Sequence, residues 1–117
     1  MFAKESGLLQ GTAELLILKT LSWGPMHGYG IATWIESATK DVLSVEEGSL
    51  YPALYRMTHK GWIRAQWRVT ENNRRAKYYQ LTAEGRRQFR EQSSGWQRFA
   101  AAVSLAVNSR TAPSWAK

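Results

Sequence analysis

Apolar side chains recur with two different periods along this chain, and the period indicates where helices and strands lie. Residues 8–21 carry so many of them that the segment predicts a helix buried on most of its surface. Residues 28–38 carry them three and four positions apart, which predicts a second, one-sided helix. Between the two, Trp23, Gly24 and Pro25 end the first helix, because proline does not continue it and glycine adopts the left-handed conformation that follows a helix end.

Residues 44–61 predict a third helix with two unlike faces. At about 100° per residue, the packing face consists of Leu50, Leu54, Met57 and Gly61, and the opposite face of Gly48, Pro52, Tyr55, Arg56 and His59. The second face offers aromatic, hydroxyl and cationic groups with little aliphatic surface, which suits a polar, anionic partner better than a protein core. We therefore interpret this segment as a recognition helix for duplex DNA.

Polar residues at the starts of these segments predict how each helix begins. Thr12 is a candidate N-cap of the first helix, and His27 is a cap or turn residue before the second rather than a ligand. Ser44 and Glu47 form the S-x-x-E pattern of a capping box for the third helix. Thr82, with an acidic residue in the turn that follows, predicts the start of a fourth helix.

Proline lies inside the predicted third helix, at position 52. A proline there removes a hydrogen bond and crowds the carbonyl four residues back. That residue is Gly48, the least obstructive one possible. We therefore expect one helix, bent or tightened near Pro52, that ends at Gly61.

Residues 62–69 change to a period of two, which is typical of a half-exposed strand. One face carries Ile63, Ala65, Trp67 and Val69, and the other carries Trp62, Arg64, Gln66 and Arg68. Residues 76–81 predict a second strand, and the polar loop at 70–75 contains asparagines, which tolerate left-handed geometry. The resulting hairpin has a basic tip, which fits along or inside a minor groove.

The last predicted helix has a sustained apolar seam. Its members are Phe89, Gln92, Trp96, Phe99, Val103 and Ala106. One helix does not bury both this seam and the core it follows, so we expect it to pair with its copy in a homodimer. The alternative is that it folds back on its own core. The expected divisions are a DNA-binding domain at 8–82, a dimerisation helix at 83–108 and a disordered tail at 109–117.

Composition excludes several classes of protein. A chain of 117 residues makes one small domain, and the absence of cysteine excludes disulfides and thiolate metal sites. Two histidines make a metal cluster improbable, and no paired carboxylates, nucleophile elbow or phosphate-binding glycine loop occurs. We therefore expect neither an enzyme nor a cofactor. The start lacks the pattern of a secretory signal, and the longest C-terminal apolar run, residues 99–107, is far shorter than a bilayer span, so we expect a cytoplasmic protein without membrane contact.

The net charge of +7 is concentrated in one part of the chain. Residues 56–87 contain nine basic and two acidic residues, which already gives +7, and the remaining residues balance. Such a concentrated excess indicates a surface that binds a polyanion. The alternative is a solvated surface that only keeps the protein soluble.

The order helix, helix, helix, hairpin, helix predicts an α+β, mainly α fold: a winged helix-turn-helix with a C-terminal dimerisation helix. The residues assigned to base edges or phosphates are Ser49, Tyr55 and Arg56, and those assigned to the DNA backbone are Lys60, Arg64 and Lys77. A dimer sets two recognition helices about 34 Å apart, which predicts a palindromic operator. The alternative is a non-specific nucleic-acid-binding or architectural protein with the same basic surface.

Five segments in this order resemble the PadR family of bacterial transcriptional repressors: GTAELLILKTL, PMHGYGI, GSLYPALYRM, KGWI and RRAKYYQLTAEGRR. The resemblance covers residues 8–87 and implies a winged-helix homodimer that represses a nearby gene and is released by an effector. The single C-terminal helix is similar to the short branch of the family. Gly30 departs from the pattern, because a larger, often acidic residue is usual there.

The resemblance also implies roles for particular residues. Tyr29 matches the tyrosine at the start of the second helix, where unpaired N–H groups favour a phosphate; its alternative is a packed aromatic. The complete predicted DNA-binding set is Tyr29, Ser49, Tyr51, Pro52, Tyr55, Arg56, Lys60, Asn73, Arg74, Arg75 and Lys77. In some short-branch members an aromatic of the last helix lines a pore at the dimer centre. By that likeness Trp96, with Phe99 of the partner subunit, binds a small planar effector, and the alternative is a tryptophan packed in the interface.

Overall fold

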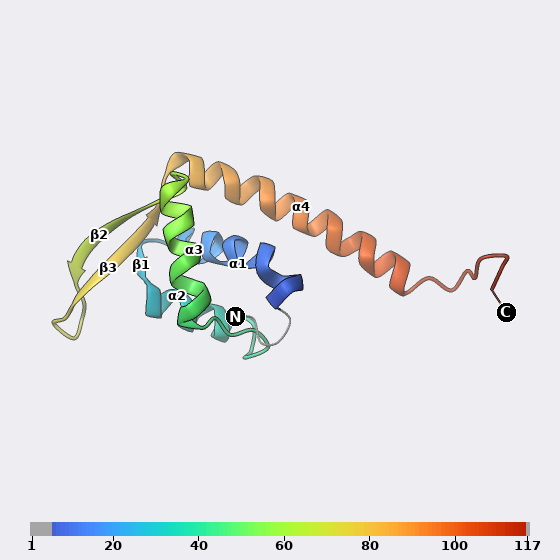
Figure 1. Cartoon of the computed structure of the whole chain (residues 1–117), viewed down its shortest axis with the longest axis horizontal. Coiled ribbons are helices and arrows are strands. Elements are labelled where there is room, and N and C mark those ends of the chain that lie inside the picture. Colours follow the sequence, from blue (N-terminus) through green and yellow to red (C-terminus); the bar gives the residue numbers. More distant parts are fainter. Residues whose placement is uncertain (1–5, 117) are drawn as a thin grey trace.

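The computed structural model describes residues 6–116, and the surroundings of side chains from residue 12 onward. Its helices are α1 (Ser6–Leu21), α2 (Gly28–Ala38), α3 (Glu47–His59) and α4 (Ala83–Val107), and its strands are β1 (Met26–His27), β2 (Ile63–Val69) and β3 (Arg75–Leu81). The first three helices lie together, the β2–β3 hairpin projects from them on one side and α4 extends away on the other (Figure 1). The mainly α fold with a small β wing is confirmed.

The starts of the first two helices test two of the predicted caps. α1 begins at Ser6, so Thr12 lies inside the helix and its prediction as the N-cap was wrong. The start of the helix was predicted from the dense apolar pattern, and the first turns of α1 lie before that pattern. α2 has the predicted bounds, and His27 is its N-cap: the Gly30 N–H donates to His27 Nδ1 at 3.0 Å.

The predicted capping box of α3 is also wrong. The helix begins at Glu47, and its N-cap residue is Glu46, which makes no side-chain capping hydrogen bond. The Glu46 carbonyl instead accepts from the N–H groups of Ser49 and Leu50 at 3.0 and 2.9 Å. Ser44 lies two residues before the cap, outside the position from which a side chain reaches the first turn. The S-x-x-E pattern is therefore present in the sequence but does not cap this helix.

The proline and the end of α3 follow the expectation. One helix continues through Pro52. It ends at His59 with Lys60 as the C-cap, and the predicted terminator Gly61 follows with a φ of +80°, in the left-handed region. The Gly61 N–H donates to the Thr58 carbonyl and the Trp62 N–H to the Met57 carbonyl, both at 3.0 Å, which is the Schellman arrangement. This turn sends the chain directly from the predicted recognition helix into the first strand of the hairpin.

The three strands form an antiparallel sheet in the order β1-β3-β2. β2 and β3 pair from Ile63↔Leu81 to Val69↔Arg75, and Asn73 in the connecting loop has the left-handed φ of +60° expected of asparagine. The hairpin prediction is confirmed, with β3 beginning one residue earlier, at 75. The two-residue strand β1, which joins the start of α2 to the sheet, was not predicted.

The core lies where α1, α2 and α3 meet the base of the sheet. Its largest fully buried side chains are Ile17, Leu18, Ile31, Ile35, Leu50, Leu54, Met57 and Ile63. Leu50, Leu54 and Met57 confirm the packing face of α3. The alternation of β2 is realised only at its base, because Ile63 is buried whereas Trp67 is 57% exposed on the same face. Beyond Ala65 the hairpin has extended past the helices that cover its inner face.

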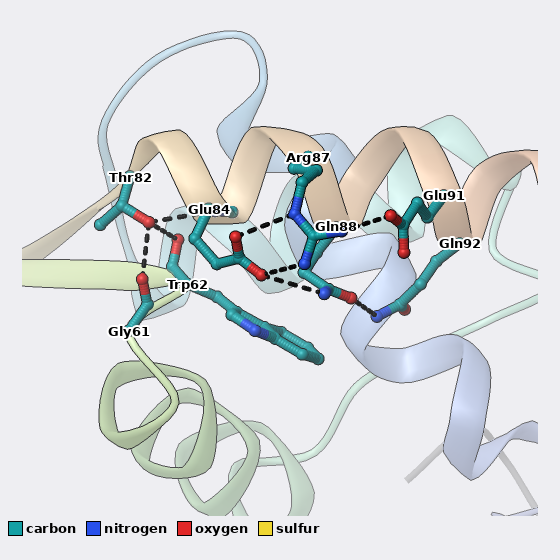
Figure 2. A network of polar contacts seen from close by, with 9 residues as sticks. Gly61, Trp62, Thr82, Glu84, Arg87, Gln88, Glu91 and Gln92 are labelled. Carbon is teal, nitrogen blue, oxygen red and sulfur yellow. Dashed lines mark hydrogen bonds and ion pairs between the residues drawn. The ribbon is translucent and has the colours of Figure 1, made fainter.

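A polar network fixes α4 to the end of α3 (Figure 2). Thr82 is the predicted N-cap, because its Oγ1 accepts from the Gly85 N–H at 3.0 Å. Its hydroxyl also donates to the Gly61 carbonyl at 2.6 Å, which the sequence did not predict. A side chain on Gly85 would place Cβ 2.0 Å from the Trp62 carbonyl oxygen. The start of α4 therefore sits directly on the α3–β2 turn, which sets the direction of α4 relative to α3.

The seam of α4 changes its surroundings along the helix. Phe89 packs against the core of its own chain. Farther along, Trp96, Phe99 and Val103 are 42, 56 and 44% exposed, as α4 extends away from the other helices (Figure 1). From 109 to 116 there is no helix or strand. Among the described residues no helix is long and apolar enough to cross a membrane.

Candidate nucleic-acid interface

A groove lies between the first turn of α2, the start of α3 and the β2–β3 hairpin, called the wing from here on. Its lining includes Tyr29 of α2, Tyr51 of α3, and Trp67, Arg74, Arg75 and Lys77 of the wing. Five of these six were predicted to bind DNA from separate segments of the sequence. The fold brings them to one concave surface of hydroxyl, aromatic and cationic groups.

Tyr51 joins α3 to the start of α2. A Cβ on Gly28 would lie 2.7 Å from the Tyr51 hydroxyl oxygen, so the ring occupies the space that only a glycine leaves open. Tyr51 is still 44% exposed and faces the groove. Burial raises the pKa of the neighbouring Tyr79, and Tyr51 adds a smaller effect in the same direction. Gly28 is thus a part of the site that the sequence analysis did not single out, although a glycine beside an N-cap is a usable signal.

Tyr29 and Gly30 occupy the first turn of α2. The Tyr29 side chain is 76% exposed, which does not fit the alternative of a packed aromatic. The contacts of position 30 explain why it is a glycine in this chain, because an added Cβ would lie 2.3 Å from the Met26 sulfur. Met26 therefore fills the space that a larger residue would need. The helix start keeps an exposed hydroxyl beside backbone N–H groups, an arrangement suited to an anion.

Two cations of the wing, Arg68 and Arg75, lie over aromatic rings. The guanidinium carbon of Arg75 is 5.1 Å from the centroid of Trp67, and that of Arg68 is 5.3 Å from the centroid of Tyr78. Within the described part of the chain, Arg68, Arg74, Arg75 and Lys77 form no salt bridge. Trp67 was not among the predicted site residues, because its position in the alternating strand placed it on the core face. Its large exposed surface identifies it here.

The exposed face of α3 continues away from this groove. Tyr55 is exposed and stacks on His59, with ring centroids 6.0 Å apart and planes at 15°, whereas Ser49 is half-buried and Pro52 exposed. At the end of the helix, Arg56 and Lys60 turn toward α1. Arg56 Nε lies 3.4 Å from Glu14 Oε2, and Lys60 Nζ lies 3.7 Å from Glu14 Oε1. These two predicted DNA-binding cations are therefore held outside the groove.

Comparison with known proteins places this geometry in a family. The family model described as the transcriptional regulator PadR-like family matches residues 17–91. A PadR-like transcriptional regulator from Bacillus cereus is 28% identical, with a TM-score of 0.78 over 90% of this chain and 100% of that chain. A transcriptional regulator from Clostridium thermocellum is 26% identical, with a TM-score of 0.77 over 85% of this chain and 96% of that chain. An uncharacterised protein X of Lysinibacillus sphaericus is 25% identical over 91 residues, which are 78% of this chain and 84% of the relative.

The three helices and the wing define a winged helix-turn-helix. With the match over most of that unit, the chain belongs to the PadR-like family of transcriptional regulators. Its class is therefore that of DNA-binding regulators, with double-stranded DNA as the partner. Members of this family are regulators and not enzymes, which agrees with the expectation drawn from the sequence. Among the described residues no group of three or more His, Asp or Glu side chains is placed to hold a metal ion.

Proposed function

We propose that the protein is a homodimeric repressor that binds a palindromic operator near its own gene and is released by a small effector. The observation that carries this proposal is the groove, where Tyr29, Tyr51 and the wing cations Arg74, Arg75 and Lys77 converge. Hydroxyl and cationic groups from three elements suit one phosphate backbone better than any apolar ligand. This convergence supports a role for the groove in holding a DNA strand.

In this proposal α3 enters the major groove beside that strand. Ser49, Pro52 and Tyr55 lie along its outward part and would meet base edges or phosphates. Asn73 and Arg74 at the tip of the wing would reach the adjacent minor groove, where arginine responds to the negative potential. Arg56 and Lys60 would contribute only after they leave Glu14.

The second half of α4 supports the proposed homodimer. Trp96, Phe99 and Val103 are large apolar side chains at a spacing of three and four that remain partly exposed in the single chain. Two copies that pair along this seam would bury these side chains and place two α3 helices about one helical turn of DNA apart. Gln92 and Ala106 lie on the same seam, and Phe89 would contribute only its remaining exposed edge.

The proposed effector site uses the same seam. The Trp96 and Phe99 rings lie 5.9 Å apart, with planes at 39°, and neither is buried in the single chain. A planar ligand between such rings of two subunits would gain stacking contacts. Titrating the protein with planar cationic drugs should quench the fluorescence of the wild type but not that of Trp96→Ala. Trp115→Ala is the matched control, because Trp115 is an exposed tryptophan outside the seam. Equal quenching of all three proteins would remove the effector role of Trp96.

The decisive experiment measures DNA affinity and mass together. Duplex from upstream of the protein's own gene should bind at least about 10³-fold more tightly than random duplex at physiological salt. Sedimentation should give the mass of a dimer, and a reporter behind the same upstream DNA should be less active when the protein is expressed. Equal affinity for both duplexes would favour the architectural alternative, and a monomer would overturn the pairing of α4.

A further inference from the structure

We propose that Trp67 is a positioning residue that holds Arg75 over the groove, so that Arg75 and its neighbour Arg74 have different tasks in DNA binding. The inference rests on the proposed DNA-binding role of the wing and deepens it. It concerns a tryptophan that the core does not use and two adjacent arginines that are equivalent in the sequence alone.

The register of the hairpin separates the two arginines. β2 and β3 pair Ala65↔Tyr79, Trp67↔Lys77 and Val69↔Arg75, so these residues share one face of the hairpin. That face begins on the core at buried Tyr79 and continues past it, to the side chains that line the groove. Arg75 lies on this strand face and lines the groove, next to Trp67 and Lys77.

Arg74 belongs to the loop and not to the strand. Its N–H donates to the Thr70 hydroxyl at 3.3 Å, and its carbonyl accepts from the Thr70 N–H at 2.7 Å. These contacts fix its backbone, while the structure gives its side chain no stacking partner among the described residues. Arg74 is thus free to follow the tip of the wing into DNA, whereas Arg75 has a defined place.

The ring of Trp67 supplies that place. It is 57% exposed, so burial does not explain a large apolar side chain here, and its centroid lies 5.1 Å from the Arg75 guanidinium carbon. Arg75 at this distance gains a cation–π contact with tryptophan, the best of the aromatic acceptors. The indole of Trp67 offers no hydrogen-bond acceptor, so the five N–H donors of the guanidinium remain available to a phosphate. Trp67 thereby limits the freedom of Arg75 without occupying its donors.

A double-mutant cycle tests this coupling. Binding of the full-length protein to upstream duplex and to random duplex is measured for Trp67→Leu in three backgrounds: wild type, Arg75→Gln and Arg74→Gln. We expect Trp67→Leu to weaken binding about two- to fivefold in the wild type, the size of an exposed cation–π contact. The same loss is expected in Arg74→Gln and no loss in Arg75→Gln. Trp67→Phe, which keeps a ring, should retain most of the affinity.

The outcomes separate the inference from the proposed function. Equal losses in Arg74→Gln and Arg75→Gln would mean that Trp67 contacts DNA itself, and no loss in any background would mean that the ring does not position Arg75. Either result overturns the inference. Equal affinity of the wild type for both duplexes would contradict sequence-specific repression, while the cycle on random duplex would still report the coupling. If Trp67→Leu lowers the melting temperature markedly, the same cycle with Trp67→Phe and Trp67→Tyr decides, because both keep an aromatic ring in the hairpin.

Discussion

Two basic regions flank the proposed DNA surface, and their cations have opposite surroundings. At the end of α3, Arg56 and Lys60 share the carboxylate of Glu14, at 3.4 and 3.7 Å. On the wing, Arg68 and Arg75 lie over aromatic rings, and neither forms a salt bridge within the described residues. In the first region one carboxylate, 42 positions before Arg56 in the chain, offsets half of the charge of the two cations, and the second region keeps its charge.

This difference matters because DNA affinity depends on charge that is available to phosphates. A cation that neutralises a phosphate releases a condensed counterion, so the slope of log affinity against log salt counts the phosphate contacts. A cation that already has a carboxylate partner must give it up first and gains correspondingly less. The wing should therefore supply most of the salt-dependent affinity.

The largest expected effect comes from removing two wing cations. Arg74→Ala combined with Arg75→Ala should weaken binding to upstream and random duplex alike and lower the salt slope by about 1.8, or 0.9 for each lost phosphate contact. Arg56→Ala combined with Lys60→Ala removes the same charge and should lower the slope by less. Fluorescence anisotropy over a series of salt concentrations gives both slopes. A larger drop for the α3 pair would reverse the comparison.

Glu14→Gln tests the α3 region from the opposite direction. Without the carboxylate, Arg56 and Lys60 become available, so DNA affinity should rise and the salt slope should steepen by up to about 0.9 for each cation that reaches a phosphate. The free energy of unfolding should fall by no more than about 1 kcal/mol, because the pairs are partly exposed.

Glu91→Gln is the matched control for this change, since it adds the same net charge but removes one of the two carboxylate partners of Arg87 on α4. It should leave the slope nearly unchanged. If Glu14→Gln instead weakens DNA binding, Glu14 serves to orient α3 and does not withhold its cations.

Much of this fold was predictable because it follows local rules. The packing face of α3, the bounds of α2, the His27 and Thr82 caps and the left-handed asparagine in the wing all depend on neighbouring residues. Ser44 failed as a cap because several polar residues precede α3, and local pattern does not choose between them. Thr12 failed because α1 begins at Ser6, before the dense apolar pattern from which its start was predicted. The sequence therefore predicted which segments are helical better than it predicted the residue at which each helix begins.

The arrangement of the site was less predictable, because it depends on contacts between distant segments. Periodicity placed Trp67 on the core face, and only the length of the hairpin beyond the helices leaves it exposed. Counting charge placed Arg56 and Lys60 with the DNA-binding residues, and only the packing of α1 on α3 brings Glu14 to them. Gly28 gained its role from Tyr51, which lies on another helix.

A smaller effect is expected from the arginine on the other face of the wing. Arg68 pairs with Ala76 across the hairpin and lies over Tyr78, on the face opposite Trp67 and Arg75. Because Arg68 is not among the residues that line the groove, Arg68→Gln should lower the salt slope by clearly less than the roughly 0.9 expected for Arg75→Gln. Salt titrations of the two single variants on the same duplex make the comparison. Equal slopes would mean that both faces of the wing contact phosphate.

The smallest effect on DNA binding is expected at the start of α4, where a third basic residue, like Arg56, has carboxylate partners. Hydrogen bonds from Arg87, and secondarily from Gln88, lower the pKa of Glu84 from 4.5 to about 2 (Figure 2). Because this folded-state pKa is depressed, the contribution of Glu84 to stability is complete above pH 4.5 and is lost as the pH falls toward 2. Glu84→Gln should therefore lower the free energy of unfolding near pH 6, and the difference from the wild type should shrink between pH 4.5 and 2. Urea unfolding of both proteins at each pH measures this difference. In an Arg87→Gln background most of that pH-dependent difference should vanish, and the DNA salt slope of Glu84→Gln should equal that of the wild type. A changed slope would place Arg87 among the cations that reach DNA, and the contrast between paired and unpaired arginines would then no longer predict which of them bind.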